Sequence, residues 1–252
     1  MSATVVIDYL PESASRYVSD HAIVTVDVIR ATTTAVTAVA LGRRCFPVPS
    51  IEAARALRRR LPRPVLAGEI GGERPPGFPV NNSPAEVAMR TDVGRPMILL
   101  SSSGTRLMHT ARGAVAAYVA CLRNATATAA FVRRHPRIAV IGAGSRGEFR
   151  EEDQLCCAWI AAELVRGGFA AGNAQTTEIV ERFGDAAPTA CAGGRSAAFL
   201  RETGQRRDLD FVLAHVNDLD QVFRLDGGEV VAVTEARGEM ASRTETAVAG
   251  QA

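Results

Sequence analysis

Residues 22–36 read AIVTVDVIRATTTAV, and this stretch decides the fold. Its first part, residues 23–28, is a short run of apolar and β-branched residues, which is typical of a buried strand. Its second part begins a helical window at residues 31–41 that ends before Gly42. A strand that leads directly into a helix is half of a βαβ unit, so the stretch predicts an α/β fold.

The same alternation of strand and helix continues along the chain. Ser83, Pro84 and Glu86 match an N-cap serine, an N1 proline and an N3 glutamate, so a helix is predicted to begin there. We predict one domain over residues 1–233, and the polar, unpatterned residues 234–252 predict a disordered tail. Further strands are predicted at residues 4–7, 44–48, 65–67, 97–100, 115–120 and 138–141, weaker ones at 222–225 and 230–233, and further helices at 51–61 and 153–166.

The composition excludes several kinds of chemistry. The 252 residues carry 29 Lys+Arg against 27 Asp+Glu, a net charge of +2, and every one of these 29 cations is arginine. Without lysine the chain can form no Schiff base, no pyridoxal phosphate anchor and no P-loop. The arginines are interspersed with acids, so we expect no nucleic-acid partner, and we interpret Arg58, Arg59 and Arg60 as the solvated end of a helix.

Cysteine usage and hydropathy bear on the cellular compartment. The five cysteines are odd in number and contain no C-x-x-C pair, which favours reduced thiols in a cytoplasmic protein over a disulfide framework or a zinc site. No apolar run reaches 18 residues, and the first residues lack the basic region of an export signal. We therefore expect a cytoplasmic protein without a membrane partner.

Polar residues follow four of the predicted strands, each at the point where its strand ends. In parallel α/β sheets, ligands bind outside the carboxyl ends of the strands, beside helix amino termini that attract anions. The sequence therefore predicts a binding site where these ends meet. The residues are Asp27, Glu69, the run Ser101–Thr105 and the run Gly142–Gly144.

Asp27 and Arg30 lie in an otherwise apolar run, where an unpaired charge would cost several kcal/mol. One interpretation is a buried ion pair between the two with a purely structural role. The other is a metal-bridged phosphate site, because Thr32, Thr33 and Thr34 open the next helix and their hydroxyls can contact an anion. The second interpretation is the one that the residue types favour.

Two loops supply further candidate groups. In LAGEIGGERPPGFPVNNSPAE, residues 66–86, Glu69 directly follows a strand and is placed to act as a metal ligand or base, while Asn82 and Ser83 offer neutral hydrogen-bonding groups. In the second loop, small residues begin a helix and can present amides and hydroxyls to the oxygens of a substrate. These substrate-binding candidates are Ser102, Ser103, Gly104 and Thr105.

Residues 142–147 match G-x-G-x-x-G after a strand, so dinucleotide binding must be considered. No second strand ends in an acid about 20 residues further on, which argues against it. An alternative from another class stays open: a non-catalytic protein that binds a nucleotide or small anion on the same fold.

The quoted segments, taken in order, resemble the 2-phosphosulfolactate phosphatase (ComB-like) family. The matching stretches are VDVIRATTTAVTA, LAGEIGG with PPGFPVNNSPAE, SSSGT, the step Asn124-Ala125 and GEFREEDQLCCAWIAAEL. The resemblance implies a three-layer α/β/α sandwich around a largely parallel or mixed sheet. It implies a magnesium-dependent phosphatase that hydrolyses a small phosphorylated anionic hydroxy acid such as 2-phosphosulfolactate.

By this resemblance, Asp27, Arg30 and Glu69 are catalytic, Asp27, Glu69 and Asp153 hold Mg²⁺, and Glu152 contacts the substrate. The chain departs from the family pattern at three places. Ile70 stands where the family usually has arginine, and the other departures are Pro79 to Asn81 and Ser102-Ser103. Because this cation is lost, a phosphatase that acts on a different phosphorylated metabolite stays open as an alternative. The protein could also form a homodimer.

Overall fold

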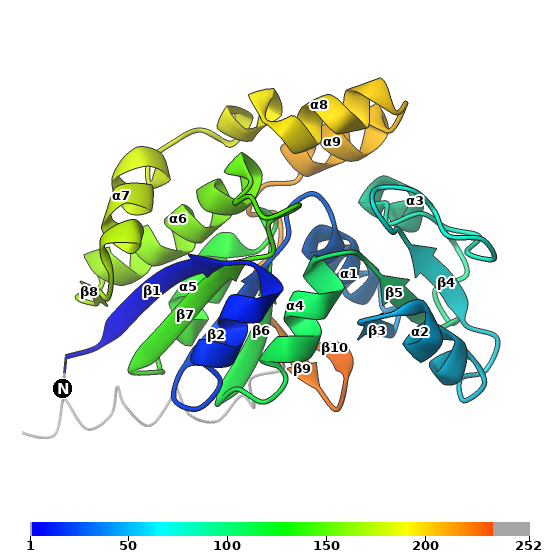
Figure 1. The fold of residues 1–252 in the computed structure, drawn as a ribbon, viewed down its shortest axis with the longest axis horizontal. Helices are drawn as coiled ribbons and strands as arrows, with labels where there is room; N and C mark the ends of the chain where they lie inside the picture. The colour runs from blue at the N-terminus through cyan, green and yellow to red at the C-terminus, as the bar shows by residue number, and fades with distance from the viewer. Residues whose placement is uncertain (1, 234–252) are drawn as a thin grey trace, which may run out of the picture.

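The computed structural model describes residues 2–233, so the predicted tail at 234–252 lies outside it. The strands of the described residues form one ten-stranded sheet in the order β4-β5-β3-β10-β9-β6-β2-β7-β1-β8 (Figure 1). Every strand predicted from the sequence is present, and the two-residue β8 was not predicted. The strands are β1 (Thr4–Tyr9), β2 (Ala22–Val26), β3 (Cys45–Val48), β4 (Val65–Gly68), β5 (Met97–Leu100), β6 (Ala116–Ala120), β7 (Arg137–Gly142), β8 (Ala170–Ala171), β9 (Phe223–Asp226) and β10 (Glu229–Ala232).

The sheet is mixed, as expected. Strands β4, β5 and β3 are parallel to one another, and so are β6, β2, β7, β1 and β8. The hairpin β9–β10 lies between these two groups and pairs antiparallel with β6 on one side and β3 on the other. The last two predicted strands therefore join the two halves of the sheet.

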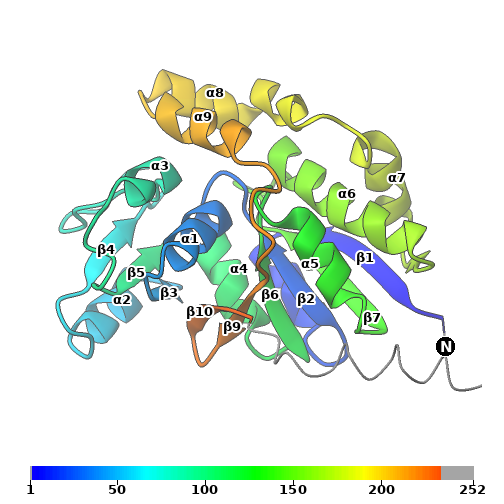
Figure 2. The same cartoon turned by 180° about the vertical axis from the view of Figure 1, so that it is seen from behind.

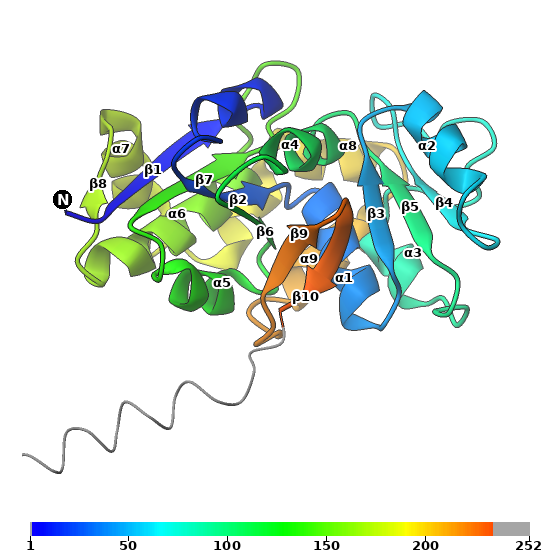
Figure 3. The ribbon, with the colours of Figure 1, turned by 90° about the horizontal axis from the view of Figure 1, so that it is seen from below.

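Helices cover both faces of each half, which confirms the layered α/β arrangement (Figure 3). They are α1 (Ala31–Ala40), α2 (Ile51–Arg58), α3 (Pro84–Ala88), α4 (Gly104–Ala111), α5 (Ala125–Val132), α6 (Glu151–Arg166), α7 (Ala174–Phe183), α8 (Arg195–Glu202) and α9 (Arg206–Ala214), with 3₁₀ helices η1 (Pro11–Arg16) and η2 (Pro188–Gly193).

Side chains alternate between the two faces along each strand. In β2, Val24 packs with α5 and α6 while Ile23 packs with η1 and α4. In β5, Leu99 packs with α1 and α3 while Ile98 packs with α2. Both faces are apolar because both are covered, and this explains the continuous apolar runs that identified the strands.

Two helices lie outside the three layers. Figures 1 and 2 show α8 and α9 side by side across the end of the sheet, above α1, with α3 on one side and α6 on the other. α9 packs on α3, and both α8 and α9 contact η2, which packs on α6. We call α8 and α9 the roof helices. They connect the two halves of the sheet at the end where the functional candidates lie.

Within residues 2–233, no helix combines the length and apolar character that crossing a membrane requires. Helix α2 ends at Arg58, and Arg58, Arg59 and Arg60 are exposed, in agreement with the interpretation of that cluster as a solvated helix end.

Candidate functional site

A cavity of about 370 Å³ lies between the ends of the strands and roof helix α8. Four strand ends contribute to its wall: Asp27 follows β2, Glu69 follows β4, Ser102 follows β5 and Gly144 follows β7. Roof helix α8 closes the opposite side with Phe199 among other residues. The structure therefore brings the predicted strand-end residues together around one space.

Four buried carboxylates line this cavity, Asp27, Glu69, Glu152 and Asp153, and the exposed Glu148 lies at its edge. Each of the four buried residues is at most 9% exposed. Four acidic side chains buried together repel one another and lose hydration, so their arrangement is costly unless protons or a cation neutralise part of the charge.

Backbone and hydroxyl donors orient two of these carboxylates. Glu69 Oε1 accepts a hydrogen bond from the Ser102 amide at 2.7 Å, and its Oε2 accepts from the Gly72 amide at 2.7 Å and from Ser102 Oγ at 3.1 Å. Asp153 Oδ1 accepts from the Val28 amide at 2.9 Å, and its Oδ2 accepts from the Gly144 amide at 3.1 Å. Glu69 thus joins the loops after β4 and β5, and Asp153 joins the loops after β2 and β7.

Burial, together with the charges of Glu69 and Glu152, raises the pKa of Asp27 to about 7. Burial also raises the pKa of Glu152 to about 7. For Asp153, burial and the neighbouring Asp27 and Glu152 raise the pKa well above its usual value. Perturbed acids that share a cavity are typical of functional sites.

Two buried oxygens at this cavity lack a hydrogen-bond partner, Asn82 Oδ1 and Glu152 Oε2. Unpartnered carboxylate and amide oxygens are the hard ligands that Mg²⁺ accepts. Among the described residues, however, no three His, Cys, Asp or Glu side chains already stand in a metal-binding cluster. The donor types nevertheless fit a magnesium ion, which one or two carboxylates together with water can hold.

Four arginines also line the cavity. Arg150 and Arg195 both pair with Glu148, and Arg30 pairs with Asp208 at 2.6 Å. The interpretation of Asp27 and Arg30 as an ion pair with each other is wrong, because Arg30 turns to roof helix α9 instead. Arg146, the fourth, is exposed and has no ion pair within the described part of the chain.

The candidate substrate-binding residues divide into two groups. Asn82, Ser102, Ser103 and Glu152 line the cavity. The others lie behind its wall, and several are held by internal bonds. Thr32 and Thr33 donate their hydroxyls to the carbonyls of Asp27 and Val28. The remaining members of this second group are Thr34, Ser83, Gly104 and Thr105.

Three of these residues shape the wall from behind. Thr105 Oγ1 donates to the Ser101 carbonyl, and Ser83 Oγ bonds Asp208 at 2.5 Å while it caps α3. A Cβ on Gly104 would lie 2.1 Å from Asp27 Oδ2, so only glycine leaves room for this carboxylate. Their positions support the cavity wall rather than contacts with a ligand inside it.

The G-x-G-x-x-G segment is not free to hold a pyrophosphate. The Gly144 amide already donates to Asp153, whose carboxylate lies in the first turn of α6, where a dinucleotide phosphate would bind. Asp153 thus takes the amide that a pyrophosphate would need, which argues against the dinucleotide interpretation.

Sequence reasoning missed the contribution of the roof helices and of the loop before α6. Arg146, Arg195, Ser196 and Phe199 line the cavity, and Asp208 holds Arg30. The only signal in the sequence was that the residues around Asp208 are polar and lack a strand pattern. Such a signal can indicate a helix, but it does not show which part of the molecule that helix covers.

The chain matches the family model described as 2-phosphosulpholactate phosphatase over residues 8–228. A probable 2-phosphosulfolactate phosphatase of Deinococcus radiodurans is 35% identical over 214 residues, 81% of this chain and 86% of the relative. A protein of the same name from Pseudothermotoga lettingae is 36% identical over 156 residues, 62% of this chain and 66% of the relative, just under two thirds. One from Thermus thermophilus is 35% identical over 163 residues, 63% of this chain and 67% of the relative.

Proposed function

The chain belongs to the 2-phosphosulpholactate phosphatase family, and from this premise we propose that it is a phosphatase, a phosphoric monoester hydrolase. We propose 2-phosphosulfolactate, or a phosphorylated hydroxy acid similar to it, as the substrate. Water would convert 2-phosphosulfolactate to sulfolactate and phosphate. The observation that carries the proposal is the convergence of four buried carboxylates and four arginines on one cavity.

The donor set supports magnesium as the cofactor. We assign Asp27, Glu69 and Asp153 as the residues that hold it, with the unpartnered Asn82 Oδ1 and Glu152 Oε2 close by. Bound Mg²⁺ would neutralise charge on the phosphoryl oxygens and on the leaving group. No lysine is present to take over that role, since all the cations of this chain are arginine.

The side chains of the cavity have separate roles in this proposal. Arg30, held against Asp208, presents positive charge toward the phosphoryl oxygens. Glu152, whose pKa is raised to about 7, can hold a proton at neutral pH and donate it to the departing hydroxyl oxygen. Phe199 and Leu200 of α8 shield the reacting groups from bulk water.

The second anionic group of the substrate needs its own cation. Ile70, which replaces an arginine of the family pattern, is 49% exposed and does not line this cavity. Arg146 and Arg195 line the cavity and can supply that charge. We assign the sulfonate, or the group in its place, to these two arginines.

Phosphate release from a panel of phosphorylated hydroxy acids tests the function directly. The panel contains 2-phosphosulfolactate and 2-phospholactate, which lacks the sulfonate, and each is measured with Mg²⁺ and with EDTA. We expect turnover of at least one member that EDTA abolishes and Mg²⁺ restores. Absence of phosphate release from the whole panel, combined with a thermal shift on adding nucleotide, would instead support the non-catalytic binding protein.

A further inference from the structure

The ion pair between Arg30 and Asp208 is almost completely removed from solvent. Arg30 Nη1 donates to Asp208 Oδ2 at 2.6 Å, and each side chain is 4% exposed. Arg30 comes from the turn between β2 and α1, whereas Asp208 comes from α9, 178 residues further along the chain. A buried pair of this kind is held in place only by the packing of both elements.

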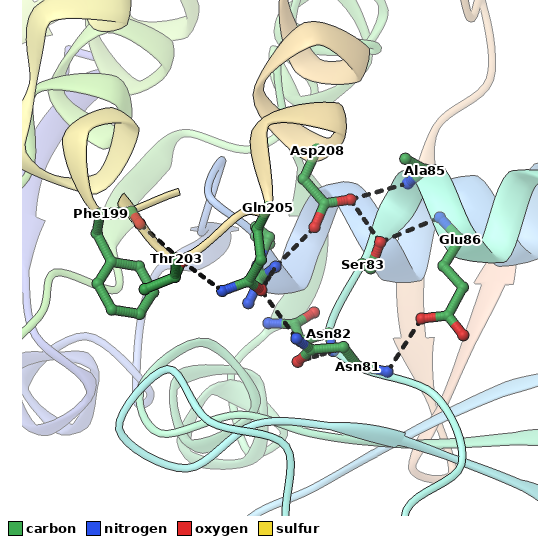
Figure 4. A network of polar contacts seen from close by, with 10 residues as sticks. Asn81, Asn82, Ser83, Ala85, Glu86, Phe199, Thr203, Gln205 and Asp208 are labelled. Carbon is green, nitrogen blue, oxygen red and sulfur yellow. Dashed lines mark hydrogen bonds and ion pairs between the residues drawn. The ribbon is translucent and has the colours of Figure 1, made fainter. Parts of the chain in front are cut away.

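The second oxygen of Asp208 holds another element. Its Oδ1 accepts from Ser83 Oγ at 2.5 Å and from the Ala85 amide at 3.2 Å, both at the beginning of α3 (Figure 4). One carboxylate therefore joins the turn after β2, the loop before α3 and the roof. Because Asn82 of that loop lines the cavity, the contact also fixes part of its wall.

Gln205, just before α9, repeats the same connection. Its Oε1 accepts from Arg30 Nη1 at 2.5 Å and from Asn81 Nδ2 at 2.8 Å, and its Nε2 donates to Thr203 Oγ1 at 2.8 Å (Figure 4). Two side chains of the roof thus bind the same guanidinium nitrogen.

Electrostatics explains why Arg30 needs a partner on the roof. Four buried carboxylates line the cavity beside Arg30, and the positive charge of Arg30 already favours the ionised form of Asp27. A guanidinium without a fixed partner would be drawn into direct pairs with those acids. Arg30 would then occupy the space, and neutralise the charge, that the substrate and its cation need.

We propose that Asp208 is a positioning residue, which holds Arg30 away from the cavity carboxylates and, through its second oxygen, fixes the roof helices over the site. The inference rests on the proposed phosphatase function. It assigns Asp208 no contact with the substrate: the residue acts through Arg30 and through the placement of α8.

A double-mutant cycle tests the positioning role. The variants are Asp208→Asn, Arg30→Gln and the two combined, with Asp210→Asn as the matched control, because Asp210 lies on the same helix in an exposed pair with Arg206. We expect Asp208→Asn to lower kcat/KM about 10- to 100-fold and Asp210→Asn to change it less than twofold. In the Arg30→Gln background, Asp208→Asn should lower kcat/KM by a smaller factor than in the wild-type background, because only the loss through the roof remains.

If Asp208 had only a structural role, the losses in kcat/KM of the two single variants would multiply in the double variant, and that result would overturn the inference. A wild-type kcat/KM in Asp208→Asn would overturn it as well. Asp208→Glu, which keeps the charge, should recover at least part of the lost kcat/KM. If Asp208→Asn does not fold, Asp208→Glu still tests the inference. Its longer side chain displaces Arg30, so its kcat/KM should fall below that of the wild type. An unchanged kcat/KM contradicts the positioning role.

Hydrogen exchange provides a readout independent of activity. Asp208→Asn should accelerate exchange of the α8 backbone amides more than Asp210→Asn does, and equal exchange in both variants contradicts the role in fixing the roof. Failure of the proposed function is distinguishable, because then the wild type itself releases no phosphate while the exchange difference persists. An active Arg30→Gln variant would instead show that Arg30 has no role in the reaction, which overturns the inference.

Discussion

At the scale of single residues, the proposed site depends on Asp27, whose carboxylate the folded chain must accommodate in a buried position. The side chain sits against Gly104 and beside Glu69 and Glu152, and burial raises its pKa to about 7. An ionised carboxylate in this place destabilises the folded chain unless a cation accompanies it. This destabilisation is consistent with a residue whose role is to bind a ligand.

Replacing Asp27 by asparagine distinguishes the destabilisation that its buried carboxylate causes from its contribution to activity. The folded-state pKa lies above the usual 3.8, so between about pH 4 and pH 7 the folded state binds more protons than the unfolded state, and stability falls as pH rises. Without divalent cations, we expect Asp27→Asn to gain Tm relative to the wild type as pH increases from 5 to 8. Thermal unfolding across this range measures it.

The same substitution should reduce phosphatase activity by at least about 100-fold if Asp27 is a charged ligand of the metal, as proposed. Asp185→Asn is the control, because that side chain is 99% exposed. A Tm difference between Asp27→Asn and the wild type that is constant with pH would contradict the raised pKa.

Arg146 offers a second test at this scale, concerned with substrate specificity. It borders the cavity, is exposed, and forms no ion pair in the described part of the chain. We expect Arg146→Gln to raise KM for 2-phosphosulfolactate about tenfold with little change in kcat, in line with the loss of one charged hydrogen bond. The KM for 2-phospholactate should change much less.

Arg59→Gln is the matched control for Arg146, since it removes one exposed cation at the end of α2 and leaves the cavity lining intact. Equal KM increases for both substrates would show that Arg146 attracts any anion and does not select the second anionic group.

At the scale of elements, the site depends on the close approach of the loop after β4 to roof helix α8. Gly72 has φ +91° and lies directly under the Phe199 ring, where a Cβ would come within 2.4 Å of a ring carbon. Its amide also donates to Glu69. The loop therefore positions a site carboxylate and supports the roof at the same residue.

Gly72→Ala is expected to displace either Phe199 or the loop and to lower kcat/KM more than tenfold. Gly77→Ala is the control, since Gly77 is in the same loop, has φ +84°, and a Cβ added to it would meet no atom within 4 Å. Both substitutions cost about 1 kcal/mol of backbone strain, so their Tm values should fall by similar amounts from this cause. Steady-state kinetics and thermal unfolding of the two variants would reject the idea if Gly77→Ala lost as much activity.

At the scale of the whole molecule, the cavity lies where two halves of one sheet and the roof meet. Strands β2 and β7 come from one half and β4 and β5 from the other, and the hairpin β9–β10 joins them. A cation held between Asp27, Glu69 and Asp153 would connect both halves. Its binding should therefore stabilise the whole fold and not one loop alone.

Magnesium is expected to raise the Tm of the wild type, and more at pH 8 than at pH 5.5. Protons compete with the cation for Asp27, whose pKa is raised to about 7. At about 100 times Kd the stabilisation is about 2.7 kcal/mol, or roughly 5 to 10 °C for a domain of this size. Calorimetric scans with MgCl₂, against NaCl of equal ionic strength, measure the effect. Asp27→Asn should lose it, and an equal shift in that variant would refute the assignment of Asp27 as a ligand.

The sequence by itself determined the order of nine of the strands, several of the helices and the residues that follow the strands. These properties are local: a buried strand needs consecutive apolar residues, and a polar residue after it marks where the strand leaves the core. Asp27 and Glu69 could therefore be placed at strand ends, and strand ends meet in an α/β sheet. The glycine-proline-rich loop lines the cavity with Glu69 and Asn82, two residues that the sequence singled out, although its contact with Phe199 was not foreseen.

Only the tertiary structure decided which polar groups bind one another. Arg30 could have paired with Asp27 three residues away, but it pairs with Asp208, and the hydroxyls of Thr32 and Thr33 turn to backbone carbonyls. A buried charge or hydroxyl takes the partner that the packed chain places within hydrogen-bonding distance, at whatever separation in sequence. That choice depends on where α9 lies across the two halves of the sheet, which no local pattern of residues encodes.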